Sequence, residues 1–338
     1  MTNTDPFQKK PQQSSEISQT PKPSSKTKIL LKTIIKIVIS SALLYIIFSR
    51  LDKESFVENL RLMDLRYAPF ILLFIILNYV VGAFRWKQLL IYKEAEDVPV
   101  GYLVNLYFIG SFFNNFMPTS VGGDAYKMYQ LGRKIGDSAK GISSTFMERF
   151  TGIIALVVIS YVGLVRTLSF WVELLPDSFQ ENSLLVLGFK FSLFVGFWIA
   201  AAGGFFSLSI LAKKSSFFKK INDAILSYKS EKKVLFVAFL TSFVVQFLSI
   251  FTQYFIFLAL GVKIPIFYAF FVFPVITLAG FFIPSINGLG VQDVLYISFM
   301  GQVGVSESLA ISASVLYHLS RLVISLIGGV LYAAGKGD

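Results

Sequence analysis

The stretch FFNNFMPTSVGGDAYKMYQL, residues 112–131, breaks an apolar segment with a proline, two adjacent glycines and an aspartate. The stretch IPSINGLGVQD, residues 283–293, breaks a second apolar segment with a proline, two glycines separated by one residue and an aspartate. The apolar parts, about 100–117 and 266–283, are short and run into these sequences instead of into charged loops. Inside a bilayer, backbone that is not helical is tolerated only where protein or a water-filled cavity surrounds it. In a membrane protein, the two stretches would therefore predict a lined polar site.

The composition indicates such a membrane protein. Of the 338 residues, 54% are hydrophobic and 15% are charged, whereas a soluble domain has about 25% charged residues. The absence of cysteine excludes disulfides, thiolate metal sites and cysteine nucleophiles. A single histidine argues against a histidine-based metal cluster. We therefore expect no metal and no other cofactor.

Six segments are apolar over the roughly 20 residues that a helix needs to cross a bilayer. These predicted spans are residues 29–49, 67–90, 142–167, 184–211, 234–260 and 309–334. Residues 1–28 are polar and rich in Pro, Ser, Gln and Lys, so we expect a disordered cytoplasmic tail. Residues 29–334 are predicted to form one all-α, polytopic membrane domain.

Loop charge predicts the orientation of the spans. The tail carries five lysines, residues 212–233 carry seven, and residues 123–141 carry four basic side chains. Residues 261–308 contain a single basic residue. The positive-inside rule puts the basic set in the cytoplasm, which six spans allow only if both interrupted stretches are re-entrant hairpins. We expect six spans, two hairpins and both termini inside; eight spans are the alternative. These 16 of the 31 basic residues make the net charge of +11 a topology signal, not evidence for nucleic acid.

The two halves, about 29–167 and 184–334, repeat one order of elements. Each reads as span, amphipathic segment, span, Pro/Gly hairpin and span containing an arginine. The amphipathic segments, about 53–66 and 217–229, fit helices in the membrane interface. Three spans per half require opposite orientations of the halves. This is the inverted-repeat plan of many transporters, in which matching interrupted segments point to the substrate site.

The hairpin glycines stand where helices are predicted to begin. Gly122 and Gly123 precede the helical segment AYKMYQL, so their N–H groups can face an anion at a helix N-terminus. Gly288 and Gly290 can do the same from the other side. The alternative is a packing turn with Asp124 as a local cap, and for one hairpin both interpretations are equally good. Two hairpins in matching positions favour a lined site.

Two arginines lie within predicted spans. At 1.5 Å per residue, Arg149 and Arg321 fall about 10 Å and about 18 Å along their spans. An arginine near the bilayer centre costs at least about 2.5–3.5 kcal/mol, so both are expected to face the protein interior or a cavity. There they neutralise an anionic group such as a lipid phosphate or, alternatively, brace buried carboxylates. Asp124 and Lys127 are three residues apart and can meet on a helix. His318 and Arg321 can meet in the same way.

Three motifs resemble one known family, the transmembrane, flippase-like region of lysylphosphatidylglycerol synthases. Residues 112–131 resemble its Pro-x-x-x-Gly-Gly-Asp/Glu-x-x-Arg segment, and SSTFMERFTGIIAL, 143–156, resembles its Glu-Arg helix. Residues 283–329 are similar to its Pro-Gly-Gly-Leu-Gly-Val-x-Glu segment and the arginine helix that follows. The resemblance covers nearly all of residues 29–334.

The chain departs from the family pattern at conservative positions. Lys127 stands where the family often has arginine, and Asp293 where glutamate is usual. Residues 285–287 replace part of the common glycine-rich run. These departures leave the headgroup preference open.

The resemblance implies a lipid-handling membrane protein. The absence of cysteine and the lysine-rich cytoplasmic loops suit a bacterial cell membrane. In fused members this region is linked to movement of aminoacylated phosphatidylglycerol between leaflets, while a separate soluble domain makes that lipid. The chain ends at Asp338, four residues after the last predicted span. It therefore looks like a stand-alone member without the aminoacyl-transfer domain, and a separate lipid-synthesising enzyme is an expected partner. No G-x-x-x-x-G-K-[ST] motif is present, so ATP is not the expected energy source.

The leading functional hypothesis is translocation of a phosphate-bearing or anionic glyco- or phospholipid between leaflets. One alternative is an integral-membrane transferase or hydrolase acting on a lipid-linked phosphate or sugar, because carboxylates with arginines suit acid–base chemistry. Another is a structural or regulatory membrane partner. The residues expected to bind the substrate are Asn115, Pro118, Gly122, Gly123, Asp124, Lys127, Glu148, Arg149, Pro284, Asn287, Gly288, Gly290, Asp293, His318 and Arg321.

Overall fold

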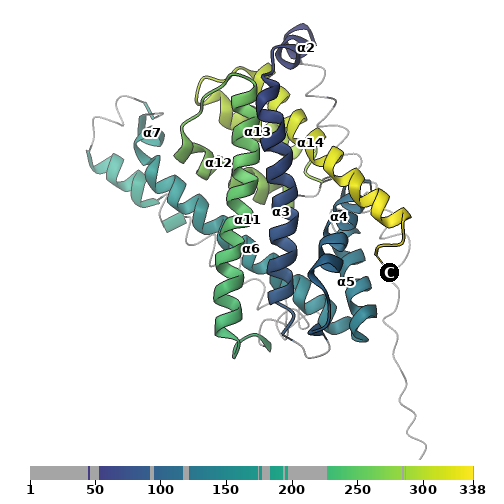
Figure 1. The fold of residues 1–338 in the computed structure, drawn as a ribbon. Helices are drawn as coiled ribbons and strands as arrows, with labels where there is room; N and C mark the ends of the chain where they lie inside the picture. The colour runs from purple at the N-terminus through teal and green to yellow at the C-terminus, as the bar shows by residue number, and fades with distance from the viewer. Residues whose placement is uncertain are drawn as a thin grey trace, which may run out of the picture.

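The computed structural model describes most of the chain from residue 53 onward. The described residues are 45, 53–91, 95–116, 122–173, 175–176, 183–192, 195–196, 227–283, 285 and 287–337. All regular elements among them are helices, which confirms the all-α membrane fold (Figure 1). The predicted tail, 1–28, lies outside the described residues. The predicted spans 29–49 and 184–211 and the amphipathic segment 217–229 lie largely outside them.

Four of the described helices are long and apolar enough to cross a membrane. They are α3 (Ala68–Gln88), α6 (Ser138–Arg166), α11 (Lys232–Ala259) and α14 (Glu307–Ala333). Each lies at a predicted span, because a long apolar run saturates its own backbone hydrogen bonds only as a helix when water is absent. Their outward faces are apolar: Leu319, Val323, Leu326 and Val330 follow one another on α14 at intervals of three or four residues and are all exposed. Such a stripe suits contact with lipid.

The remaining helices are shorter. They are α2 (Lys53–Arg61), η1 (Leu65–Tyr67), α4 (Val100–Phe116), α5 (Gly122–Ile135), α7 (Leu168–Glu173), an apolar helix at Ser183–Ser192, α12 (Ile266–Phe282) and α13 (Val291–Gly301). Helices α4 and α12 have 17 residues each, about 26 Å at 1.5 Å per residue, which is at the lower limit for a span. Whether α4–α5 and α12–α13 are re-entrant or cross the bilayer stays a prediction.

Helix α7 lies between the predicted spans 142–167 and 184–211, where no helix was predicted. Its residues Phe170 and Trp171 pack on the ring of Tyr268, with ring centroids 5.3 and 6.0 Å away. The Trp171 ring also meets Phe271 at 5.3 Å. Aromatic packing against α12 therefore extends the helical structure beyond α6, a long-range contact that local polarity does not reveal.

The two halves of the chain pack on each other reciprocally. Helix α3 lies against α11 in the centre, α4 lies along α14, and α12 lies along α6 (Figure 1). Glycines permit both outer crossings: a Cβ on Gly163 would lie 2.5 Å from the backbone nitrogen of Phe271, and one on Gly328 would lie 1.9 Å from the carbonyl oxygen of Phe108. This exchange of partners between halves is the pattern that a twofold-related repeat predicts.

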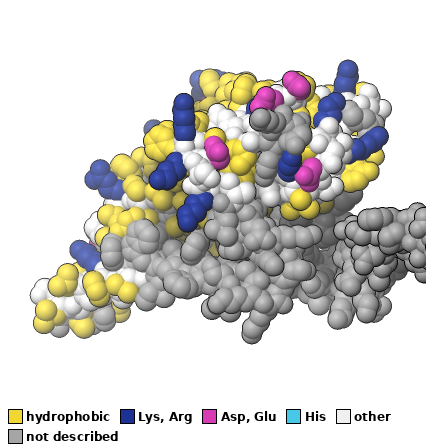
Figure 2. Space-filling view, turned by 90° about the horizontal axis from the view of Figure 1, so that it is seen from below, with side chains coloured by type: hydrophobic (Ala, Val, Ile, Leu, Met, Phe, Trp, Pro, Cys, Tyr) yellow, Lys and Arg dark blue, Asp and Glu magenta, His cyan; other side chains and the backbone are white. Residues whose placement is uncertain are grey.

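Basic residues from both predicted cytoplasmic loops lie at one end of the molecule. Tyr228, just before α11, donates its hydroxyl proton to the carbonyl oxygen of Leu89 at 2.6 Å, which joins the start of α11 to the end of α3. Lys232 and Lys233 at this end are exposed. Figure 2, seen from below Figure 1, shows lysine and arginine side chains over this end. The segregation agrees with the loop-charge prediction, and the side of the membrane stays a prediction.

Candidate functional site

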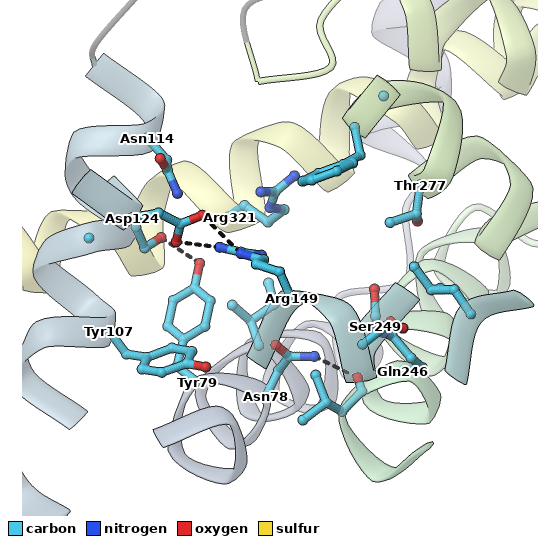
Figure 3. Close-up of a pocket in the computed structure, with 18 of the residues that line it drawn as sticks. Asn78, Tyr79, Tyr107, Asn114, Asp124, Arg149, Gln246, Ser249, Thr277 and Arg321 are labelled. Atoms are coloured by element: carbon cyan, nitrogen blue, oxygen red, sulfur yellow. Dashed lines mark hydrogen bonds and ion pairs between the residues drawn. The ribbon is translucent and has the colours of Figure 1, made fainter. Parts of the chain in front are cut away.

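A cavity of about 290 Å³ lies between the two halves (Figure 3). Its walls come from α3, α4, α5 and α6 of the first half and from α11, α12, α14, the start of α13 and the loop before it in the second. The polar and charged lining residues are Asn78, Tyr79, Arg85, Tyr107, Ser111, Asn114, Asp124, Lys127, Glu148, Arg149, Gln246, Ser249, Thr252, Thr277, Asn287, Gln292, Tyr317 and Arg321. The charged predicted residues of the first half thus meet Arg321 of the second at one place.

Glu148 on α6 is the shared acceptor of a buried ion-pair cluster and is 1% exposed. Its carboxylate accepts a hydrogen bond from Arg85 Nη2 at 2.9 Å and one from Lys127 Nζ at 3.2 Å. The hydroxyl of Tyr107 donates a third. All three donors come from different helices, α3, α5 and α4. Glu148 therefore ties the first half together, and the buried carboxylate requires its cations because an unpaired charge there is costly.

Asp124 in the first turn of α5 holds the other arginine of α6. Arg149 donates from Nε at 2.9 Å and from Nη2 at 2.6 Å to the two carboxylate oxygens, the forked geometry that arginine makes with a carboxylate. Lys127 Nζ also lies 3.3 Å from Asp124. The Arg149 side chain is 40% exposed while that of Asp124 is 9% exposed. The guanidinium is thus anchored by Asp124 (Figure 3), and Arg149 lines the cavity.

Lys127 lies between two aromatic rings as well as two carboxylates. Its ammonium is 4.1 Å from the centroid of the Tyr107 ring and 5.1 Å from that of the Trp86 ring. The Trp86 N–H in turn donates to Ser144 on α6 at 3.2 Å. A cation over aromatic faces is stabilised by the ring quadrupoles, more so when it is desolvated. The protein's own lysine therefore fills an ammonium site.

Arg321 on α14 has only neutral partners among the residues that the structure describes. Its Nη2 donates to the side-chain oxygen of Asn287 at 3.4 Å, and its guanidinium lies 5.4 Å from the centroid of the Tyr317 ring. No carboxylate of the described residues pairs with it. The predicted contact between His318 and Arg321 is not formed, because His318 faces Asp293 instead.

The second hairpin has a strained turn that reaches the first hairpin. Asn287, Gly288 and Gly290 have φ values of +50°, +85° and +82°, in the left-handed region that glycine and asparagine adopt most readily. The Asn287 amide donates to the side-chain oxygen of Asn115 at the end of α4. The turn therefore places one amide between the first hairpin and Arg321.

Asp293 at the start of α13 lies outside the cavity lining and is 3% exposed. It accepts hydrogen bonds from the Gly290 N–H at 2.7 Å and from the Ser314 hydroxyl. His318 Nε2 lies 3.5 Å from Asp293 and makes no hydrogen bond among the described residues. Counting 14 residues back from the crossing glycines Gly163 and Gly328 leads to Arg149 and to Ser314. In the second half, Ser314 contacts the hairpin carboxylate Asp293. At the matching position in the first half, Arg149 contacts the hairpin carboxylate Asp124.

The helix N-termini of the hairpins are not used as predicted. The Gly123 N–H donates to the side-chain oxygen of Asn114 at 2.8 Å, and the Gly290 N–H donates to Asp293. A Cβ on Gly123 would lie 1.9 Å from the carbonyl oxygen of Gly110 on α4. Gly123 therefore serves close helix packing, and the protein's own side chains occupy the N–H groups of Gly123 and Gly290. The expectation that these two N–H groups face an anion is therefore corrected.

The predicted site residues divide into three groups. Asp124, Lys127, Glu148, Arg149, Asn287 and Arg321 line the cavity. Asn115, Gly122, Gly123, Gly288, Gly290, Asp293 and His318 lie outside its lining. Pro118 and Pro284 lie outside the described residues.

Sequence reasoning missed Arg85, Tyr107 and Gln246. Arg85 is 4% exposed and also donates from Nη1 to Ser242 on α11 at 3.0 Å. An arginine so near the end of a predicted span is usually one whose side chain extends to the membrane interface. Its position therefore gave no reason to expect a buried ion pair. Tyr107 and Gln246 are ordinary residues of apolar helices and carry no such signal. Among the described residues, no three carboxylates or imidazoles come together as a metal site needs.

Comparisons with known proteins agree with the motifs. The family described as the lysylphosphatidylglycerol synthase TM region matches residues 33–329. A UPF0104 membrane protein of Methanothermobacter thermautotrophicus is 27% identical over 77% of this chain and 83% of its own length. The UPF0104 membrane protein PH1989 of Pyrococcus horikoshii is 23% identical over 89% of this chain and 96% of its own length. No solved structure matches the chain.

Proposed function

We propose that this chain, which belongs to the family of the lysylphosphatidylglycerol synthase transmembrane region, moves a lipid with an anionic, phosphate-bearing headgroup between the leaflets of a membrane. The headgroup enters the cavity between the halves, and the acyl chains remain in the bilayer. The membrane would be the cell membrane, with both termini in the cytoplasm.

The observation that carries the proposal is the excess of cationic side chains at the cavity. Arg321 is left with neutral partners, and Arg149 is bound to Asp124 on one side while 40% of its side chain is exposed. Both line the same cavity. An arginine without a counter-charge at membrane depth is expensive and normally marks a ligand or an ion path. A phosphate offers the acceptor oxygens that guanidinium groups bind best.

The size of the cavity supports a headgroup ligand. Ligand pockets enclose about 300–1,000 Å³, and this cavity, at about 290 Å³, has room for a small polar group but not for a whole lipid. The exposed apolar stripe of α14, the helix that carries Arg321, is suited to contact with acyl chains. A polar interior beside an apolar exterior is what a lipid needs if only its headgroup is to leave the interface.

The test is leaflet redistribution in liposomes. The full chain is reconstituted into phosphatidylcholine vesicles that contain a fluorescent anionic phospholipid in the inner and outer leaflets, and a membrane-impermeant quencher reports exchange. We expect exchange to exceed that of protein-free vesicles. Arg149→Gln should reduce the exchange rate to that of protein-free vesicles. Arg166→Gln, an equivalent change at the far end of the same helix, should keep the wild-type rate. Equal rates for all three proteins, each folded, would refute the proposal.

The same vesicles distinguish a transferase or hydrolase. Both cavity carboxylates, Asp124 and Glu148, accept charge-assisted hydrogen bonds from two or more donors, so the described residues favour binding over acid–base chemistry. Lipid extracts analysed by mass spectrometry should contain only the lipid supplied. A new lipid species would replace translocation with catalysis as the function.

A further inference from the structure

The charges that line the cavity do not balance. Among the lining residues that the structure describes, four cationic side chains, Arg85, Lys127, Arg149 and Arg321, face two carboxylates, Asp124 and Glu148. At neutral pH this leaves an excess of two positive charges. The nearby carboxylate of Asp293 does not line the cavity and already accepts hydrogen bonds from Gly290 and Ser314.

The two excess charges lie in different halves of the protein. In the first half, Arg85, Lys127 and Arg149 share two carboxylates, and the cluster is short of acceptors: the buried Nε of Arg85 has no hydrogen-bond partner among the described residues. In the second half, Arg321 has only neutral partners among the described residues, so its positive charge is uncompensated. A low-dielectric interior disfavours such an excess unless an occupant supplies the opposite charge.

Among the described residues, the cavity leaves no carboxylate unpaired for an amine. An ammonium group forms its strongest hydrogen bonds with a carboxylate. Lys127 already lies over the rings of Trp86 and Tyr107, and it contacts both cavity carboxylates. An aminoacylated headgroup would add a positive charge to a site that already has too many.

We propose that the cavity selects a lipid phosphate monoester, whose headgroup carries up to two negative charges and no amine. A monoester phosphate has a charge of about −1.5 to −2 at pH 7 and three strong acceptor oxygens, which matches the excess of two; a phosphodiester supplies one charge. The inference rests on the proposed function, since it names the lipid class that this same cavity takes.

The experiment compares three fluorescent lipids in vesicles of otherwise pure phosphatidylcholine. They are phosphatidate, a monoester, phosphatidylglycerol, a diester, and lysylphosphatidylglycerol, a diester with amines. Rates in protein-free vesicles are subtracted. We expect phosphatidate to exchange at least about tenfold faster than phosphatidylglycerol, because the second charge adds a charge-assisted contact, and lysylphosphatidylglycerol not to exchange.

A charge variant tests the stoichiometry. Arg321→Gln removes one excess charge, so the preference for phosphatidate over phosphatidylglycerol should fall by about tenfold. Arg321→Lys should restore most of it, and Arg166→Gln should leave it unchanged. An unaltered preference in Arg321→Gln would overturn the inference.

The remaining outcomes separate this inference from the proposed function. If phosphatidylglycerol or lysylphosphatidylglycerol exchanges as fast as phosphatidate, the inference fails and the proposed function stands. If no lipid exchanges, both fail. Radiolabelled inorganic phosphate in the same vesicles tests the free anion: uptake of phosphate without lipid exchange would assign the cavity to a soluble monoester and overturn the lipid assignment, whereas phosphate that is excluded supports it.

Discussion

Replacing Glu148 with glutamine should destabilise the protein more than replacing Asp124 with asparagine, although both changes remove one cavity carboxylate. Glu148 is 1% exposed, and its cationic partners Arg85 and Lys127 are 4% and 3% exposed. Without the carboxylate charge, Arg85 keeps no carboxylate partner and Lys127 keeps only Asp124, while both cations remain almost fully buried. Asp124 pairs mainly with Arg149, whose side chain is 40% exposed and can be hydrated instead.

The structure sets the expected magnitudes. Removing one partner from a buried ion pair costs about 3–5 kcal/mol, so Glu148→Gln should lower the free energy of unfolding by that amount. Asp124→Asn removes hydrogen bonds to a charged group that stays partly hydrated, for which about 1.5–3 kcal/mol is typical. The free energy comes from a titration of the purified protein in mixed micelles with a denaturing detergent, followed by helical circular dichroism.

A double variant provides the control. In Glu148→Gln with Arg85→Met, one of the uncompensated cations is gone, so the combined loss should fall short of the sum of the single losses by about 1–3 kcal/mol. Two results would refute the reasoning. One is a loss below about 1 kcal/mol for Glu148→Gln, because no buried charge could then have lost its partner. The other is strict additivity in the double variant.

Three further expectations follow from other parts of the molecule. Gly328→Ala forces a Cβ to within 1.9 Å of the backbone of α4 and should cost about 1–3 kcal/mol by overpacking, whereas Gly101→Ala, with no atom within 4 Å, should leave the unfolding titration unchanged. Asn287→Ala removes the amide that joins α4 to α14 and should slow lipid exchange in vesicles; an unchanged rate would show that the amide is not part of the path. Because the chain has no cysteine, single Lys134→Cys and Lys263→Cys variants can each be labelled with a thiol reagent that does not cross the membrane. The two variants should react from opposite sides of the membrane, and labelling of both from the same side would contradict the predicted topology.

Much of the fold was predictable because the signals are local. The spans at α3, α6, α11 and α14 follow from the length of their apolar runs, and the break between α4 and α5 follows from glycine and proline. The short helix α7 was not predictable, since it packs on aromatic rings of α12 nearly 100 residues away. The paired use of Asp124 by Lys127 was predictable from their spacing alone.

The sequence by itself determined that this is an all-helical membrane protein with two interrupted segments and a few charges at membrane depth. Insertion costs make each such charge a marker wherever it occurs. Only the tertiary structure decided how those charges pair: Glu148 with Arg85 across 63 residues, Arg149 with Asp124, and Arg321 with no carboxylate among the described residues. Partners depend on how each helix is rotated and where helices cross, which close glycine contacts between the halves determine. The excess positive charge of the cavity is therefore a property of the packing, although every residue that creates it can be read in the sequence.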